Sequence, residues 1–209
     1  MALLDVPSTK SALLALRRQL DFAEEGYGLL EQKRELLLLE LQARRARAAP
    51  ARRAAEETLL RAFAALRTAL LDAGSGALDR AALGAAAAHN AEIKERRLMG
   101  VRTPEVSAPA QTPGAVFGPG GTPASADEAR RSFAGILPQL AALAGLETSV
   151  LRLGRELKKT QRRCNALSKK VIPDCRETIT FLGGALEERE REAYVTLKMV
   201  RNRLRAKRE

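Results

Sequence analysis

The sequence is poor in aromatic residues. Among its 209 residues there is no Trp, and there are only two Tyr and five Phe. Ala, Leu, Arg and Glu dominate instead, and β-branched residues are few, a mixture that is typical of long helices and coiled coils. The composition therefore argues against an ordinary globular domain. A pair of long helices buries only one narrow apolar seam, so we expect modest stability in isolation and dependence on partners.

Cysteine and histidine are also scarce. The two cysteines, Cys164 and Cys175, are eleven residues apart, which on one helix separates them by roughly 16 Å of rise. A disulfide needs Cα atoms within about 7 Å, so a bridge within one helix is excluded. The only histidine, His89, is far from both, so a four-ligand zinc site is excluded as well. We expect the cysteines to fill a helix seam in a reducing compartment and His89 to be structural.

Catalytic constellations are missing. There is no Ser/His/Asp set, no glycine-rich loop between a strand and a helix, and no carboxylate pair in an apolar setting. The GPGG segment at 118–121 lacks the Lys and Ser/Thr of a phosphate loop, so it indicates a turn. We expect a non-catalytic protein with no cofactor and no metal.

Long apolar runs are absent too. No stretch of 18 or more apolar residues exists, and the first residues, MALLDVPSTKS, have no basic segment followed by an apolar one. We expect a soluble, intracellular protein without direct membrane insertion, which can lie beside a membrane through a partner.

Positive charge is abundant, and it is concentrated toward the C-terminus. The net charge is +11, and residues 152–209 carry 17 Lys and Arg against 8 Asp and Glu, a net +9. Such a balance favours an acidic partner: nucleic acid, an anionic surface or an acidic protein lining.

The first half of the chain predicts one long helix. Ser8 or Thr9 can cap it, Pro50 interrupts and bends it, and Gly74 ends it, which gives a helix over about residues 9–72. Apolar or small residues follow at steps of three and four, the spacing of a seam against a partner helix. The seam comprises Leu13, Leu16, Leu20, Ala23, Tyr27, Leu30, Arg34, Leu37, Leu41 and Arg44.

Two kinds of residue depart from this seam pattern. Arg34 and Arg44 can extend their charged ends to solvent, pair with acids or face another subunit. Gly26 and Gly28 each cost about 1 kcal/mol of helix stability relative to Ala. They indicate either close approach of another backbone or tolerated flexibility.

The middle of the chain is rich in Gly and Pro. We expect a short helix over about 78–98, followed by extended segments at GVRTPEV (100–106) and GAVFGPGGTP (114–123). A small β-hairpin is compatible with these turn residues.

The last part predicts a second long helix that begins at Ser125 or Asp127, with Pro138 near its start. Its seam slips by one residue at the VIP sequence and then resumes, and Pro173 stands directly after the slip, where we expect a local kink. The seam comprises Leu143, Leu146, Val150, Leu153, Leu157, Thr160, Cys164, Leu167, Val171, Ile172, Cys175, Ile179, Leu182 and Leu186.

These segments predict an all-α fold. A long N-terminal helix (1–73) and a long C-terminal helix (127–209) pair as an antiparallel two-helix coiled coil, and a middle insert (74–126) lies at the far end. At 1.5 Å per residue such a rod is about 100 Å long, with both termini at one end.

Four stretches resemble the D subunit of V-type (V/A-type) rotary ATPases, and together they span nearly the whole chain. The first is PSTKSALLALRRQLDFAEEGYGLLEQKRELLLLEL, with the family's Pro, Thr and basic residue before a helix that carries Gly, Leu-Leu and Lys-Arg. The second, ELKKTQRRCNALSKKVIPDCRETITFL, resembles the family's E-[IL]-KKT-x-RR-x-NALE-x-VIP block and is the most specific. The third is LEEREREAYVTLKMVR, and TPEV in the middle is a weaker match. Cys164, Ser168 and Ala193 depart from the family pattern.

The resemblance implies a non-catalytic central rotor shaft that transmits torque between ATP hydrolysis or synthesis and ion translocation. Its implied partners are the subunits of the catalytic head, a small central-stalk subunit and a socket subunit above the membrane ring, with no nucleic acid bound. The protein would be cytoplasmic and peripheral to the membrane. We expect Lys198 to Arg208 to meet acidic residues of the head. The candidate interface residues are Lys33, Arg34, Lys158, Lys159, Arg162, Arg163, Pro173, Glu187, Glu188, Arg189, Arg191, Lys198, Arg201 and Arg205.

The basic stretch KKTQRRCNALSKK also allows other interpretations. It fits a solvated coiled-coil face or a surface for a partner protein, and a basic helix can neutralise nucleic acid. The aromatic residues that stack on bases are absent from it. The alternative function is therefore a basic coiled-coil scaffold or a nucleic-acid-binding protein.

Overall fold

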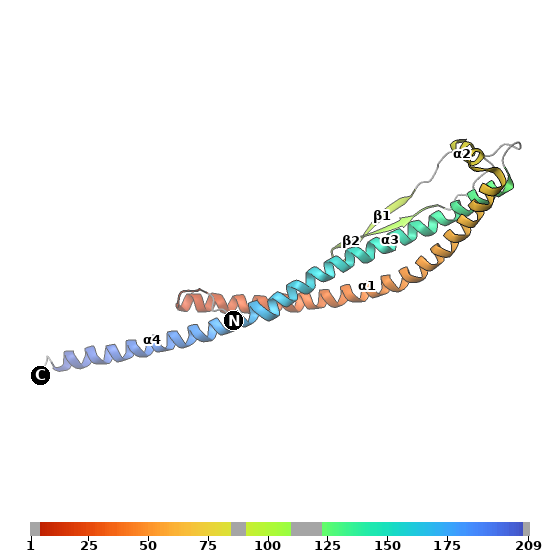
Figure 1. The fold of residues 1–209 in the computed structure, drawn as a ribbon. Coiled ribbons are helices and arrows are strands. Elements are labelled where there is room, and N and C mark those ends of the chain that lie inside the picture. The colour runs from red at the N-terminus through yellow and green to blue at the C-terminus, as the bar shows by residue number, and fades with distance from the viewer. Residues whose placement is uncertain (1–4, 85–90, 110–122, 207–209) are drawn as a thin grey trace. The chain divides into compact units, whose positions relative to one another are not determined.

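The computed structural model describes residues 5–84, 91–109 and 123–206. The chain forms two long helical segments with a short helix and a two-stranded hairpin between them (Figure 1), which confirms the predicted fold class. The elements are α1 (Lys10–Ala73), α2 (Ser75–Gly84), β1 (Glu92–Leu98), β2 (Val101–Ser107), α3 (Ala124–Ala166), the π-helical segment η1 (Leu167–Val171) and α4 (Ile172–Ala206).

Helix α1 begins and ends where its capping residues predict. The Oγ1 atom of Thr9 accepts the backbone N–H of Ala12 at 3.2 Å, which satisfies one free donor of the first turn. At the other end Gly74 has φ +74° and donates its N–H to the carbonyl of Leu70 at 3.0 Å, the left-handed ending that glycine favours. Pro50 lies inside this helix, as expected.

The chain packs as two compact units, and each is described by itself. The first unit contains residues 1–35 and 158–209, and the second contains residues 36–157. In the first unit Arg176 donates to Glu24 at 2.6 Å, whereas Arg34 donates to Gln161 at 3.1 Å. As the residue number rises along α1, that of the partner falls, so the two helices run antiparallel.

The predicted seam forms the core of the first unit. Leu16, Cys175 and Leu182 are buried, with Leu13, Leu20, Val171 and Ile179 packed against them. Both cysteines are almost completely buried, which confirms their expected place in the seam. Gly26 and Gly28 have no atom within 4 Å of a Cβ added to them, so close approach of another part of the described chain is not the reason for these glycines.

The slip of the seam at VIP corresponds to a π-helical turn. The backbone N–H of Ile172 bonds to the carbonyl of Leu167, five residues earlier, over the segment Leu167–Val171. A π turn holds one more residue than an α turn, so a one-residue shift brings the following seam residues back to the same face. Pro173, which has no N–H to donate, follows directly in the first turn of α4.

The second unit has two buried clusters along its helix pair. Leu37 of α1, Leu153 of α3 and Val101 of β2 form the first, and Ala69, Ala126 and Ala129 form the second. Between them the ring of Phe63 meets that of Phe133 edge to face, with centroids 5.4 Å apart. The fully buried residues of α1 beyond the predicted seam are small and lie seven residues apart: Ala55, Ala62 and Ala69.

The hairpin corrects one prediction about the middle of the chain and confirms another. The helix expected over 78–98 is wrong from Glu92 onward, because α2 ends at Gly84 and Glu92–Leu98 is strand β1. The short extended segment predicted at GVRTPEV is confirmed as strand β2, and it pairs with EIKERRL of strand β1. Most of the other proposed extended segment, and His89, lie outside the described residues. Met99 (φ 49°) and Gly100 (φ 82°) connect the strands, and two residues of positive φ are typical of a type I′ turn.

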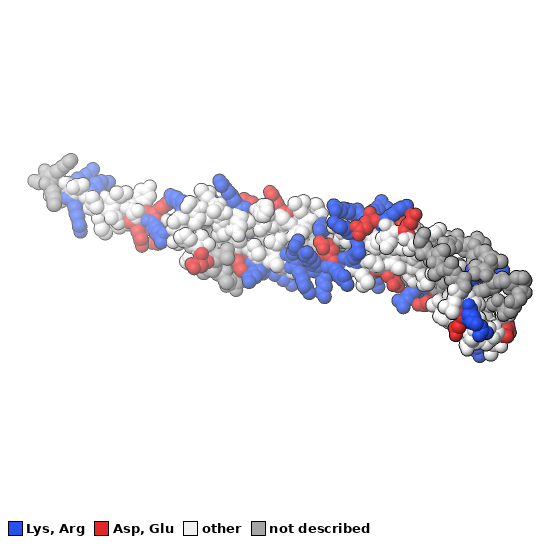
Figure 2. Space-filling view, turned by 90° about the horizontal axis from the view of Figure 1, so that it is seen from above, with Lys and Arg blue, Asp and Glu red and all other residues white. Residues whose placement is uncertain are grey.

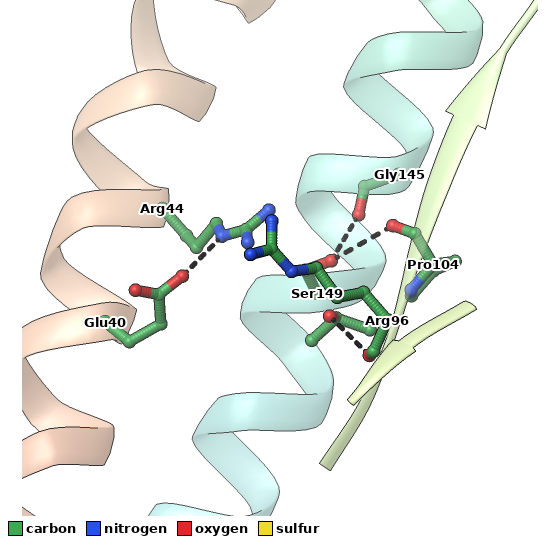
Figure 3. A network of polar contacts seen from close by, with 7 residues as sticks. Glu40, Arg44, Arg96, Pro104, Gly145 and Ser149 are labelled. Atoms are coloured by element: carbon green, nitrogen blue, oxygen red, sulfur yellow. Dashed lines mark hydrogen bonds and ion pairs between the residues drawn. The ribbon is translucent and has the colours of Figure 1, made fainter. Parts of the chain in front are cut away.

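Strand β2 lies directly on α3. A Cβ added to Gly145 would lie 3.1 Å from the backbone nitrogen of Val106, so only glycine fits this contact without a shift. Ser149 donates to the carbonyl of Gly145 at 2.8 Å and lies 3.4 Å from that of Pro104 (Figure 3). The nitrogen and the carbonyl of one residue in an antiparallel strand point to the same side. Because the carbonyl of Pro104 points toward α3 and away from β1, its nitrogen does so as well, and no hydrogen bond between the strands is lost through the missing N–H.

Candidate functional site

All of the predicted interface residues belong to the first unit. Lys33, Arg34 and Pro173 are half-buried. The others are exposed: Lys158, Lys159, Arg162, Arg163, Glu187, Glu188, Arg189, Arg191, Lys198, Arg201 and Arg205. Apart from Pro173, which lies in the first turn of α4, they fall into three groups along the helix pair, and the structure gives these groups different surroundings.

The first group surrounds Arg34 in the seam. Its guanidinium pairs with Glu31 one turn earlier and donates to Oε1 of Gln161 at 3.1 Å, and Gln161 in turn donates to Asn165 at 3.0 Å. Arg44, in the second unit, pairs with Glu40 at 2.7 Å in the same way (Figure 3). Of the three interpretations of the seam arginines, pairing with acids is the one that the structure shows.

The thiol of Cys164 lies in the same region as this polar group. Burial raises the pKa of Cys164, and the negative charge of Glu31 adds to the effect, whereas the nearby charge of Arg34 lowers it. Burial likewise raises the pKa of Cys175, with a further contribution from Asp174. Both shifts favour the protonated thiol, which fits buried seam residues rather than nucleophiles.

The second group is a basic face formed by Lys158, Lys159, Arg162 and Arg163. All four side chains are exposed, and none of them makes an ion pair with another described residue. The surface view shows Lys and Arg gathered in dense groups, with Asp and Glu scattered among them (Figure 2). This basic face is therefore available to an acidic partner.

The third group begins where the helix pair ends. Arg189 donates to the backbone carbonyl of Ser8 at 2.7 Å, and Lys10 pairs with Glu190. The hydrogen bond and the negative charge of Glu190 raise the pKa of Lys10. Arg189, a predicted contact to other subunits, therefore also fastens the start of the chain to α4.

Beyond this point α4 continues as a C-terminal extension, residues 191–206. Every residue of the extension is exposed, although many are apolar. The exposed apolar side chains are Tyr194, Val195, Leu197, Met199, Val200 and Leu204, and the cations between them are Arg191, Lys198, Arg201, Arg203 and Arg205. An isolated helix of this length is only marginally stable in water, so the extension has the composition of a segment that another chain covers.

The described residues offer no metal site, since no group of three or more His, Cys, Asp or Glu lies together among them. One 18-residue window of the continuous helix Ala124–Ala206 has a mean hydropathy of 1.3, which is apolar enough to cross a membrane by length and composition. A core helix of a soluble protein passes the same test, so this window carries no membrane assignment.

The sequence matches the family model of the ATP synthase D subunit over residues 12–202. This chain belongs to the ATP synthase D-subunit family. It is 36% identical over 210 residues to the D subunit of an A-type ATP synthase from Pyrococcus abyssi, covering 98% of this chain and 97% of the relative. It is also 36% identical over 202 residues to the D subunit of a V-type ATP synthase from Thermus thermophilus, with 97% and 90% covered. A D subunit of a V-type ATP synthase from Treponema pallidum is 36% identical over 195 residues, with 93% of each chain covered.

Membership of this family confirms the resemblance seen in the motifs and makes the chain a subunit of a V/A-type ATPase. The three departures from the family pattern have different surroundings. Cys164 is buried in the seam, Ser168 is half-buried in the π turn, and Ala193 is exposed on the C-terminal extension. Only the last of these lies on a surface that is free in the described chain.

The sequence predicted only some of the side chains on these surfaces. Charge pointed to the basic side chains of the C-terminal extension but not to its apolar ones. Their exposure follows from where α1 begins, because the helix pair ends opposite Lys10.

Proposed function

We propose that this chain is the non-catalytic central rotor shaft of a V/A-type ATPase, which transmits torque between the catalytic head and the membrane ring. Long helices paired along a buried seam support this role, because a paired helix resists bending and twisting better than a single one. In the first unit the seam holds Leu16, Leu182 and Cys175 out of water, while ion pairs such as Glu24 with Arg176 lie along its edge.

The observation that carries the proposal is the C-terminal extension. It is an exposed helix in which apolar residues such as Leu197 and Val200 alternate with cations such as Lys198 and Arg201. We place it inside the catalytic head, with its cations facing acidic residues there. A shaft must turn past chemically equivalent positions without being trapped at one of them. Long, mobile Arg and Lys side chains attract without rigid shape matching, which suits that requirement.

The remaining partners follow from the same proposal. A small central-stalk subunit would bind the side of the helix pair, where the basic face at Lys158, Lys159, Arg162 and Arg163 is exposed. A socket subunit above the membrane ring would receive the other end of the shaft. The protein would then be cytoplasmic and peripheral to the membrane, held there by its partners.

Truncation after Glu192 tests this function. The described residues among those removed, 193–206, are all exposed and bury no seam contact, so the free energy of unfolding of the isolated chain should stay the same. Assembly with the catalytic head and ATP hydrolysis coupled to ion movement should be lost. A full-length variant with Lys198, Arg201 and Arg205 changed to Glu provides the second arm, since it keeps the helix and reverses only the charge. If coupled activity and head assembly survive both changes, the proposal is wrong.

A further inference from the structure

The hairpin places two arginines directly opposite each other. Arg97 of β1 is the register partner of Arg102 of β2. The carbonyl of Arg102 accepts a hydrogen bond from Arg152 of α3, so it faces away from β1. Arg97 and Arg102 are therefore a non-hydrogen-bonded pair, the type of pair in which opposite Cα atoms and side chains lie closest.

Like charges at such a position destabilise a hairpin, and little in the described chain offsets them. Arg97 makes no hydrogen bond or ion pair with another described residue. Arg102 has Glu95 at 3.9 Å, the outer limit of an ion pair, and both of these side chains are more than half exposed. Arg152 adds a third guanidinium to the same end of the hairpin, with its Nη1 atom 2.9 Å from the carbonyl of Arg102.

The turn beside these arginines adds an exposed apolar side chain. Met99 is 47% exposed and connects the two strands. Arg and Met are both enriched at protein–protein interfaces, where an apolar contact is combined with directional hydrogen bonds. The end of the hairpin thus has the composition of a small contact surface, although the isolated chain leaves it uncovered.

The acids of the hairpin limit what can bind there. Glu92 and Glu105 lie toward the other end of the strands, and Glu92 is close to Lys94 at 3.6 Å. A long polyanion, such as nucleic acid, or an anionic membrane would extend over these acids and be repelled. A short segment that carries a few carboxylates would meet the arginines, with Glu95, 3.9 Å from Arg102, as the nearest acid of the hairpin.

We propose that the hairpin tip, formed by Arg97, Met99 and Arg102 with Arg152 beside them, binds a carboxylate-bearing segment of another subunit of the ATPase. This inference rests on the proposed function. A guanidinium can bind a carboxylate through two parallel hydrogen bonds, so one or two acids would both satisfy the pair and remove its repulsion. Binding therefore gains free energy from two sources, the new contact and the relief of the repulsion between Arg97 and Arg102.

The substitution Arg97→Glu separates structure from binding. It replaces the repulsive pair with a pair of opposite charge across the two strands, so the hairpin amides of the isolated chain should exchange with solvent more slowly than in the parent protein. The same change puts a carboxylate against the partner's carboxylates, and the affinity for the rest of the complex should fall about ten-fold. A merely structural arginine would give the first effect without the second.

The experiment uses full-length tagged chains in the assembled complex, purified at low salt and washed with rising salt until half of the chain is released. Arg67→Glu is the matched control, because Arg67 is an exposed arginine of the same unit on α1 and carries the same charge change. We expect release at lower salt for Arg97→Glu, and release as in the parent protein for Arg67→Glu.

Three outcomes overturn the inference. If Arg97→Glu is released at the same salt as the parent protein, the tip is not a docking surface. If the variant instead loses only retention on vesicles that contain phosphatidylserine, the partner is a lipid surface and not a protein. If the parent chain joins no ATPase subunits at all, the proposed function fails, and that result is distinct because it does not depend on the variant.

Discussion

Replacing Gly145 with alanine tests how the hairpin is held on α3. Gly145 lies in the middle of this helix, where glycine costs about 1 kcal/mol relative to alanine. With nothing nearby, Gly145→Ala would therefore stabilise the protein. The structure predicts a different result, since the added methyl group would meet the backbone nitrogen of Val106 at 3.1 Å and the carbonyl of Pro104 at 3.4 Å.

The size of the effect follows from what must move. Backbone atoms cannot rotate aside as a side chain can, so β2 has to shift away from α3 by a few tenths of an ångström. The bond from Ser149 to Pro104 is already 3.4 Å long and would be lost, and that from Arg152 to Arg102, at 2.9 Å, would weaken. Each is worth about 1 kcal/mol, so these losses offset or exceed the helix gain.

Gly154 supplies the control. It lies in the same helix, and a Cβ added there has no atom within 4 Å. Gly154→Ala should raise the free energy of unfolding by about 1 kcal/mol. The free energy of unfolding of Gly145→Ala should be lower than that of Gly154→Ala by about 1–2 kcal/mol. Urea denaturation followed by circular dichroism measures the difference, and hydrogen exchange should show faster exchange of the hairpin amides in Gly145→Ala alone. Equal stabilisation by both changes, with hairpin exchange unaltered, would refute the docking argument.

Two further predictions concern the buried residues. Leu37→Ala should lower the free energy of unfolding by about 2–4 kcal/mol, because this side chain is fully buried against Val101 and Leu153. Leu39 is 63% exposed, so the control Leu39→Ala should change the free energy of unfolding by less than about 0.5 kcal/mol. Urea denaturation measures both, and similar values would contradict the assigned seam. Burial raises the pKa of Cys164 and Cys175 above that of a thiol in the unfolded chain. As pH rises, the thiols of the unfolded state therefore deprotonate before those of the folded state. The free energy of unfolding, unaffected at neutral pH, should then fall as pH rises beyond about 8.5. The same pH series on a variant with both cysteines changed to alanine should lack this part of the decline; an identical decline would show that the thiols do not contribute.

The sequence predicted the helices well because their signals are local. Three- and four-residue steps identify a seam wherever large apolar residues stand between charges, as at Leu16 and Leu182. Thr9 and Gly74 mark the ends of α1 through capping chemistry that needs no other element. The one-residue slip at VIP was also visible, but its form as a π turn required the backbone hydrogen bond from Ile172 to Leu167.

Other features were hidden because they depend on distant contacts. EIKERRL has no apolar alternation and consists largely of residues that favour helices, so it becomes a strand only because β2, docked on Gly145 and Ser149, pairs with it. The alanine contacts of α1 were missed for a different reason. Alanine is abundant throughout the chain, so its recurrence at Ala55, Ala62 and Ala69 does not stand out from composition.

That alanine seam has a consequence for handling the protein. Because alanines occupy the fully buried positions of α1 in this part of the second unit, several of its larger apolar residues are left to face solvent. Leu60 and Leu71 are 71% and 80% exposed, and Leu70 is 41% exposed. An isolated chain thus carries an exposed apolar surface that favours self-association during expression and purification. Production together with its partner subunits is the condition under which this surface can be covered.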